Sequence, residues 1–283
     1  MNYAKAFRVE LGGRVELSKI DADYKGDHED KSSAQRELEE YSRRLGDLQY
    51  LMYAENKRSL LIVLQAMDAG GKDGTIRHVL AAMNPQGCEV HGFKAPSVEE
   101  LAQDYLWRIH KAAPRKGHVT VFNRSHYEDV LAVRVHSLVP KEVWSERYDE
   151  INAFEKELGN NGTHIIKFYL HIDKDEQLAR FKERIDDPTT QWKISESDYA
   201  EREYWDEYQR AYEDAISKCN TNTAPWYIIP ANHKWFRNLA ISQILVESLE
   251  SFKMSMPAPT VDIKEIRRKY HKAAEEDTSK IEK

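Results

Sequence analysis

Apolar residues along this chain follow two patterns, and the two patterns alternate. Short apolar runs predict strands at 60–64, 118–122, 164–172 and 226–229, and the run at 60–64 suits a strand covered on both faces. The mixed segment 88–93 is expected to form a further strand. Apolar residues spaced three or four apart predict amphipathic helices, at 32–56, 75–83, 99–111, 140–158, 175–186, 197–218 and 235–252. Strands alternating with helices indicate a parallel sheet with helices on both faces, so we expect an α/β fold, a three-layer α/β/α sandwich.

The same patterns divide the chain into three parts. Residues 1–56 begin with a weakly patterned stretch and end with the first amphipathic helix, which predicts an N-terminal helical extension. Residues 57–256 hold the alternating strands and helices of the core domain. Residues 257–283 are charged and poor in apolar positions, which predicts a mobile tail or a helix laid on the surface. Basic residues in this tail could contact a polyanion, but a solvated charged face is the simpler interpretation.

A glycine-rich loop directly follows the first predicted strand. Its glycines give the backbone freedom to turn amide groups toward an anion, and Lys72 stands at the place of the Walker lysine. The chain departs from the usual P-loop pattern twice, with Ala66 at the first glycine and Asp73 at the Ser/Thr position. The residues expected to cradle phosphates are Ala69, Gly70, Gly71, Lys72, Asp73 and Gly74.

Asp68 lies inside this anion-binding loop and needs an explanation. A carboxylate there would repel a phosphate unless a divalent cation lay between them, so metal ligation is the favoured role for Asp68. Asp73 stands in place of the Ser/Thr hydroxyl that ordinarily binds magnesium. The ion would therefore need another oxygen ligand, and Asp68 can supply it. Two alternatives stay open: Asp68 as a general base, and Asp68 as a local hydrogen-bond partner in a tight turn.

A second polar segment, residues 121–130, follows another predicted strand. The carboxyl ends of parallel strands gather at the ligand crevice, so these side chains should face the phosphates. Many P-loop enzymes end this strand with a metal-binding Asp, but here Asn123 occupies that place. An amide holds a metal-bound water only weakly, so Glu128 or Asp129, one helical turn further on, could supply the missing charge.

Arg124 in this segment is the best candidate for a fork that grips a phosphate with two hydrogen bonds. The alternative is a purely structural ion pair with Glu128 or Asp129. Arg134 is a further candidate anion clamp. His126 could serve as an acid or base, but transfer to a phosphate oxygen needs neither, so we interpret it as structural.

A lid is predicted near residues 174–196. Arg180 and Arg184 share one face of a helix, and a loop carrying Trp192 and Lys193 follows. Arginines delivered by a closing segment neutralise charge on a transferred phosphoryl group, an effect of order 10³-fold or more in rate. The alternative is a surface helix whose arginines pair with neighbouring glutamates.

Composition excludes several classes of protein. The 283 residues can bury a full core, and a net charge of −6 argues against general nucleic-acid binding. Two cysteines, Cys88 and Cys219, cannot make a disulfide framework, and both are expected to be reduced. The N-terminus has no signal-like apolar region, and no run is long enough to cross a bilayer. We therefore expect a soluble, cytoplasmic protein.

Over residues 32–252 the chain resembles the polyphosphate kinase 2 family. The resemblance rests on residues 68–74 (Asp-Ala-Gly-Gly-Lys-Asp-Gly), on residues 123–129 (Asn-Arg-Ser-His-Tyr-Glu-Asp) and on the arginine-rich stretch that ends in residues 187–193. It implies a P-loop fold like that of nucleoside monophosphate kinases and transfer of a phosphoryl group between inorganic polyphosphate and a nucleotide. The sequence of the second motif resembles that of the branch whose members accept both AMP and ADP. The resemblance also suggests magnesium, with manganese as the alternative ion, and a homo-oligomer.

The mechanism we expect is direct in-line transfer. In it Lys72 and the loop amides hold phosphates, Asp68 anchors the metal and Arg124 grips the phosphate chain. The remaining expected contacts are Arg134, Arg180, Arg184 and Lys193 on phosphates, and Asn123 and Glu128 on the nucleotide. Two other functions stay open: an ATP-dependent nucleoside monophosphate kinase, and a nucleotide-binding protein without catalytic activity.

Overall fold

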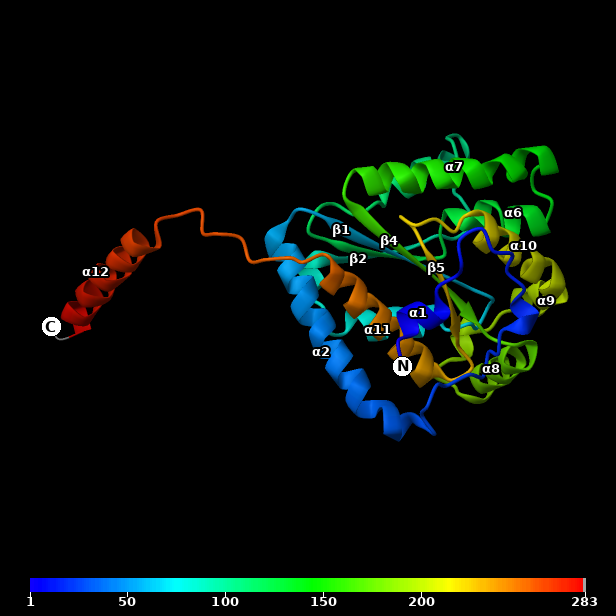
Figure 1. Ribbon diagram of the computed structural model, residues 1–283, viewed down its shortest axis with the longest axis horizontal. Coiled ribbons are helices and arrows are strands. Elements are labelled where there is room, and N and C mark those ends of the chain that lie inside the picture. The colour runs from blue at the N-terminus through cyan, green and yellow to red at the C-terminus, as the bar shows by residue number, and fades with distance from the viewer. Residues whose placement is uncertain (282–283) are drawn as a thin grey trace.

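Residues 1–281, which the computed structural model describes, contain a five-stranded sheet with helices on both sides (Figure 1). The strands are β1 (Ser59–Ala66), β2 (Cys88–Gly92), β3 (Val119–Asn123), β4 (Thr163–His171) and β5 (Trp226–Pro230). Their order is β2-β3-β1-β4-β5, and each neighbouring pair runs parallel. The predicted α/β sandwich with a parallel sheet is therefore confirmed.

The central strand explains why apolar runs predicted this sheet so well. All eight residues of β1 are buried, because β3 and β4 pair with its two edges and helices cover both faces. Leu60, for example, lies opposite Val119 on β3 and His164 on β4. Since the strands are parallel, the ends of β1 and β3 come together at one edge of the sheet.

Figure 1 places α7 on one side of the sheet and α2 with α11 on the other. The helices are α1 (Tyr3–Phe7), α2 (Lys31–Glu55), α3 (Lys72–Leu80), α4 (Val98–Leu101), α5 (Trp107–Lys111), α6 (Ala132–Val135), α7 (Lys141–Asn160), α8 (Lys174–Asp186), α9 (Glu196–Glu203), α10 (Trp205–Lys218), α11 (Lys234–Ser251) and α12 (Ile263–Ile281). Short 3₁₀ turns are η1 (Leu17–Lys19), η2 (Pro85–Gly87), η3 (His126–Asp129) and η4 (Gln191–Lys193).

The N-terminal residues pack into the same core as the sheet. Asp30 caps α2 by accepting a 3.0 Å hydrogen bond from the Ser33 amide, and the helix then lies along α11. Before α2, Arg8 pairs with Tyr227 of β5 in an antiparallel bridge, and the side chain of Tyr3 is only 2% exposed. The helices of residues 1–56 thus share their apolar faces with the core domain rather than projecting from it.

Two predicted helices are shorter than the apolar spacing indicated. The helix expected at 99–111 is broken between α4 and α5, because Val98 and Leu101 stay 88% and 68% exposed and have no surface to pack against. The helix expected at 197–218 turns at Tyr204, which separates α9 from α10 and lets Trp205 enter the core. In contrast, α3 begins at Lys72, three residues earlier than predicted, because Gly71 caps it.

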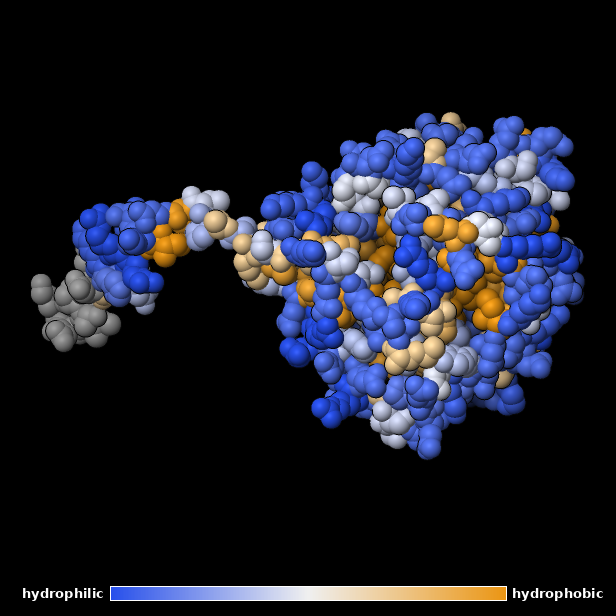
Figure 2. Space-filling view, in the orientation of Figure 1, coloured by the Kyte–Doolittle hydropathy of each residue, from blue (hydrophilic) through white to orange (hydrophobic). Residues whose placement is uncertain are grey.

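The C-terminal segment forms the helix α12, which Figure 1 shows standing away from the body at the end of an extended link. The helix was one of the two forms expected for this tail, but it is not laid on the surface of the body. A small apolar patch at its start includes Val261 and Ile263, about half exposed, among hydrophilic side chains (Figure 2). Within the described residues, no helix combines the length and apolar character that a bilayer crossing requires.

Candidate active site

A large cavity opens at the carboxyl ends of β1 and β3. Its volume is about 1980 Å³, and its walls come from the glycine-rich loop, the second polar segment, the lid region and the start of α11. This is the edge of a parallel sheet at which ligand crevices form. The structure therefore brings the predicted site segments together around one space.

The glycine-rich loop has the geometry of an anion cradle. Gly71 has a φ of +97° and is the N-cap of α3, so the loop turns sharply into the start of that helix. A Cβ on Gly70 would overlap the side chain of Ala66, and a Cβ on Gly71 would overlap Arg237. The first departure from the P-loop pattern is thus accommodated, since Ala66 is the last residue of β1 and Gly70 makes room for its methyl group.

Lys72 reaches back across this loop into the cavity wall. Its Nζ donates a 3.0 Å hydrogen bond to the carbonyl oxygen of Ala66. Burial, with a smaller contribution from Arg124, lowers the pKa of Lys72 to about 8. A bound phosphate would stabilise the charged form of this buried ammonium, because the anion takes the place of the solvent that burial removes.

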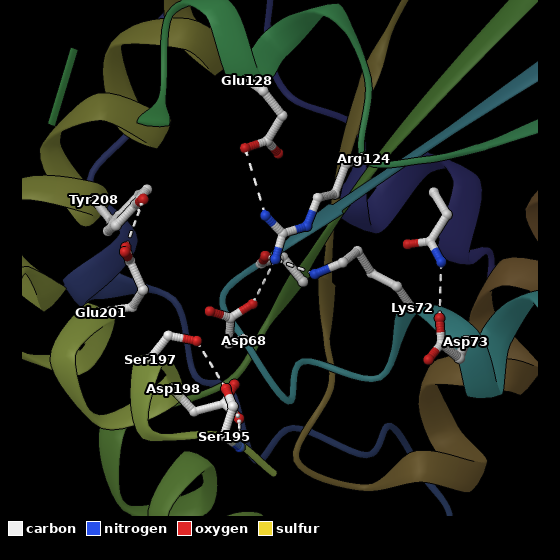
Figure 3. A network of polar contacts seen from close by, with 12 residues as sticks. Asp68, Lys72, Asp73, Arg124, Glu128, Ser195, Ser197, Asp198, Glu201 and Tyr208 are labelled. Carbon is white, nitrogen blue, oxygen red and sulfur yellow. Dashed lines mark hydrogen bonds and ion pairs between the residues drawn. The ribbon is translucent and has the colours of Figure 1, made fainter. Parts of the chain in front are cut away.

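Arg124 links the two motifs through a pair of carboxylates. Its Nη2 donates to Oδ1 of Asp68 at 2.8 Å, and its Nη1 lies 3.8 Å from Oε2 of Glu128 (Figure 3). Burial raises the pKa of Glu128, against the opposing effect of Arg124 and Lys72. Arg124 has a φ of +61°, a conformation that turns its side chain away from the path of β3 and toward the loop. The side chain of Arg124 is 43% exposed and lines the cavity while it is paired.

Asn123 makes a contact that the sequence did not suggest. Its Nδ2 donates to Oδ1 of Asp73 at 2.7 Å, which ties the end of β3 to the first turn of α3. Asn123 and Asp73, which each stand where many P-loop proteins have a metal ligand, are thus partners. The nucleotide contact expected of Asn123 stays a prediction, and the side-chain Oδ1 and the second Nδ2 hydrogen are left for it.

Asp68 fits a cation that is shared with bound phosphates. Its Oδ1 is paired with Arg124, and its Oδ2 has no hydrogen-bond partner in the described part of the chain. The described residues contain no group of three or more His, Cys, Asp or Glu side chains able to hold a metal by themselves. One or two carboxylates are what Mg²⁺ uses when substrate phosphates and water complete its shell.

The two lid arginines have different surroundings. Arg180 is 4% exposed and donates to the carbonyl oxygens of Ala69, Ala231 and Asn232 and to Glu176. It therefore braces the glycine-rich loop with four of its five N–H donors, and it also lines the cavity, so its phosphate contact stays a prediction. Arg184 is half-buried, donates to the Lys193 carbonyl at 3.5 Å and lies over the ring of Phe181. It lines the cavity with Lys193, so the phosphate contacts expected of both residues stay predictions.

Arg134 is also placed differently from the anion clamp we expected. It donates to Asp214 at 2.7 Å and to the hydroxyl of Tyr148 at 3.2 Å, and it stacks over the ring of Trp144. Among the described residues that line the cavity, Arg134 is absent. Its contacts are those of a residue that joins α6 to α7 and α10.

Arg237 is the functional candidate that sequence reasoning missed. It lies on α11, is 3% exposed, and packs against Gly71 and Gly74 of the loop. The only hydrogen-bond partner of its guanidinium within the described chain is Oδ1 of Asn238, so the charge has no carboxylate partner there. Burial, together with Arg180, lowers the pKa of Arg237 to about 9. The sequence around Arg237 gives no signal of a phosphate site, but an unpaired buried cation beside the loop would be stabilised by a phosphate.

A buried network supports the second motif from behind. Lys167 on β4 donates to Oε2 of Glu155 at 2.5 Å and to the carbonyl of Cys219 at 2.6 Å. Tyr127 accepts from Lys167 at 2.9 Å and donates to Oε1 of Glu155 at 2.8 Å. His126 lies 3.2 Å from that same oxygen, and burial lowers its pKa, which keeps the ring neutral. These contacts agree with the structural role predicted for His126.

Comparison with known proteins points in the same direction as this geometry. The family model described as polyphosphate kinase 2 matches residues 28–257. The AMP/ADP-polyphosphate phosphotransferase of Meiothermus ruber is 52% identical over 256 residues, which is 90% of this chain and 96% of that protein. The ADP-polyphosphate phosphotransferase of Rhodopseudomonas palustris is 46% identical over 268 residues, 90% of this chain and 93% of that one.

The fold agrees as well. The crystal structure of polyphosphate kinase 2 from Arthrobacter aurescens TC1 superposes with a TM-score of 0.92 at 40% identity, covering 96% of this chain and 97% of that one. The family model also spans both motifs and the lid region that line the cavity. The resemblance seen in the motifs is confirmed, and the chain belongs to the polyphosphate kinase 2 family.

Proposed function

We propose that this protein transfers phosphoryl groups between inorganic polyphosphate and adenine nucleotides, with both AMP and ADP as acceptors. The observation that carries the proposal is the convergence of Lys72, Arg124, Arg237 and the loop amides on one cavity of about 1980 Å³. That space is large enough for a nucleotide and a length of polyphosphate side by side. The name of the Meiothermus relative, which cites AMP and ADP, supports the choice of acceptors.

The chain's own residues account for the chemistry by positioning and charge. Lys72 and the loop amides hold phosphate oxygens, while Arg124 is aimed at the transferred group by its pair with Asp68. The attacking oxygen of AMP or ADP is already ionised, so no side chain has to remove a proton. We propose Mg²⁺ as the metal, with Asp68 as its protein ligand. When bound, it would supply charge neutralisation to the phosphates.

A donor and acceptor assay tests this proposal. The purified protein is incubated with long-chain polyphosphate, Mg²⁺ and either AMP or ADP, and the nucleotides are then separated. We expect ADP and ATP to form, with polyphosphate consumed in step. Transfer to AMP from ATP alone would instead identify a nucleoside monophosphate kinase, and binding without any turnover would identify a protein without catalytic activity.

The lowered pKa of Lys72 predicts a pH dependence of polyphosphate binding. Lys72 is charged below its pKa of about 8 and loses its charge above it, so the KM for polyphosphate should rise as pH increases through 8 to 9. Nucleotide phosphates are fully ionised well below that range and do not mask the effect. The measurement is KM for polyphosphate between pH 7 and 9.5. The variant Lys72→Arg, which stays charged, should show a flat profile, and equal slopes in both proteins would contradict the assignment.

The contacts of Arg134 predict that its replacement affects stability more than activity. Its ion pair with Asp214 is partly exposed, so Arg134→Gln should cost about 1 kcal/mol of unfolding free energy and leave kcat and KM within about twofold. The comparison variant Arg124→Gln should lower kcat/KM by about 10²-fold or more. Urea unfolding and steady-state rates measure both. If Arg134→Gln raised the KM for polyphosphate by about tenfold or more, the result would support the original expectation that Arg134 binds phosphate.

Assembly and location stay predictions. The expected homo-oligomer can be measured by sedimentation velocity, and the expected cytoplasmic location by fractionating cells that produce the protein.

A further inference from the structure

One wall of the cavity differs in character from the phosphate-binding wall. Lys72 and Arg124 carry cationic groups on the loop and the second motif, whereas α9 and α10 present Glu201 and Tyr208 to the same space (Figure 3). His136, at the end of α6, lines the cavity beside them. A fixed carboxylate repels phosphate, so this part of the cavity suits a neutral portion of the substrate.

Glu201 is held in place by two contacts that leave one oxygen free. Its Oε2 accepts a 2.8 Å hydrogen bond from the Tyr208 hydroxyl and lies 3.0 Å from Nε2 of His136. Its Oε1 has no hydrogen-bond partner among the side chains and backbone that the structure describes, and the side chain is 33% exposed. A carboxylate that is oriented on one oxygen and open on the other is a ready acceptor for a donor group on a ligand.

The substrates differ in what they can offer to such an acceptor. Ionised polyphosphate has no hydrogen-bond donors, whereas a nucleotide has ribose hydroxyls and base nitrogens. Vicinal ribose hydroxyls are recognised by a carboxylate in dinucleotide-binding proteins, a precedent for the same chemistry. Val133, Leu138 and Val139 line the cavity near His136, and they provide the apolar contact that a base needs beside the sugar.

We propose that Glu201 accepts hydrogen bonds from the ribose hydroxyls of the nucleotide, with Tyr208 and His136 orienting its carboxylate. This inference rests on the proposed nucleotide substrate and adds the place where the nucleoside binds. It also sets the orientation of the nucleotide in the cavity, since the sugar lies against α9 and α10 while the phosphates lie against the glycine-rich loop. The enzyme should consequently prefer ribonucleotides to deoxyribonucleotides.

Selectivity between AMP and its deoxy analogues tests the proposal. A hydrogen bond to a charged group is worth a factor of about 10 to 100, so the wild-type protein should prefer AMP to 2′-deoxy-AMP or 3′-deoxy-AMP by that factor in kcat/KM. Glu201→Met, which has similar length but no acceptor, should reduce the preference to within about twofold. Glu201→Gln, which keeps one acceptor without the charge, should be intermediate. Equilibrium binding of the same nucleotides gives a second readout for any variant with slow turnover.

Tyr208→Phe is the matched control, because it removes a contact to Glu201 but keeps the carboxylate. It should retain most of the preference for AMP even where its rates for both nucleotides fall. If Glu201 serves only to fasten α9 to its neighbours, Glu201→Met will slow AMP and deoxy-AMP equally, and that result would overturn the inference. A wild-type protein that does not distinguish AMP from both deoxy analogues would also overturn it.

Inosine monophosphate distinguishes a contact between Glu201 and the base from a contact between Glu201 and the ribose. A preference for AMP over that nucleotide that disappears in Glu201→Met, while the ribose preference stays, would assign Glu201 to the base and reject the sugar. Failure of the proposed function would be a separate result, in which the wild-type protein transfers no phosphoryl group from polyphosphate to AMP or ADP. In that case the binding measurements still decide whether Glu201 reads the ribose.

Discussion

Replacing Lys72 by methionine is expected to lower kcat/KM by about 10³-fold or more and to leave the protein folded. Methionine fills the same volume, but it brings no charge to the loop and no donor for the phosphate or for the Ala66 carbonyl. Loss of one preorganised donor at a site of developing charge costs about 10² to 10³ in rate, and here a full positive charge is lost with it. The hydrogen bond to Ala66 is part-buried, so the loss of unfolding free energy should be only about 1 kcal/mol.

The comparison protein for this prediction is Lys141→Met. Lys141 is exposed at the start of α7, outside the described residues that line the cavity, so the same chemical change there should leave the rate within about twofold. Rates of polyphosphate-dependent ATP formation and a thermal unfolding curve are measured for both. If the Lys72→Met protein kept a tenth or more of the wild-type rate, the glycine-rich loop would not take part in phosphoryl transfer.

The strands and the loop could be predicted from sequence because their signals are local. A buried parallel strand must be apolar throughout, and the run at 60–64 met that requirement on its own. A tight turn into a helix needs glycine where φ is positive, and Gly71 supplies it within a few residues of the strand. Such features depend on neighbours in the chain, so the sequence displays them directly.

The long-range contacts of the arginines could not be predicted, because spacing along a helix does not tell what covers each face. Arg180 and Arg184 are four residues apart, yet α8 turns only Arg180 against the backbone at Ala231 and Asn232. Arg237 reaches the loop from α11, far along the chain, and nothing near it in the sequence indicates a phosphate site. Both cases depend on long-range packing.

The pair formed by Asn123 and Asp73 is a third example of this limit. Each residue looked like a defect in its own motif, since each stood where another P-loop protein keeps a metal ligand. The order of the sheet sets β3 beside β1, and the two side chains therefore meet at 2.7 Å. Knowing the strand order would have turned two unexplained departures into one predicted contact.

Replacing Asp68 by asparagine should lower kcat/KM by about 10² to 10³-fold and raise the Mg²⁺ concentration that gives half the maximal rate. The amide keeps the shape of the side chain and one acceptor for Arg124, but it loses the charge that pairs with the guanidinium and that would attract a cation. A cation held by one carboxylate and by phosphates depends strongly on that single charge, since the protein supplies little else. The rate is measured against Mg²⁺ concentration at saturating nucleotide.

The control for this change is Asp73→Asn, the same substitution five residues further along the loop. Asp73 accepts from Asn123 and lies in the first turn of α3, so its loss should reduce the rate by less than about tenfold and leave the Mg²⁺ dependence unchanged. The difference between the two variants isolates the metal role, because both lose one negative charge from the same loop. Equal losses in both would mean that the charge of the loop matters in general, and near-normal rates in Asp68→Asn would place the cation elsewhere in the cavity.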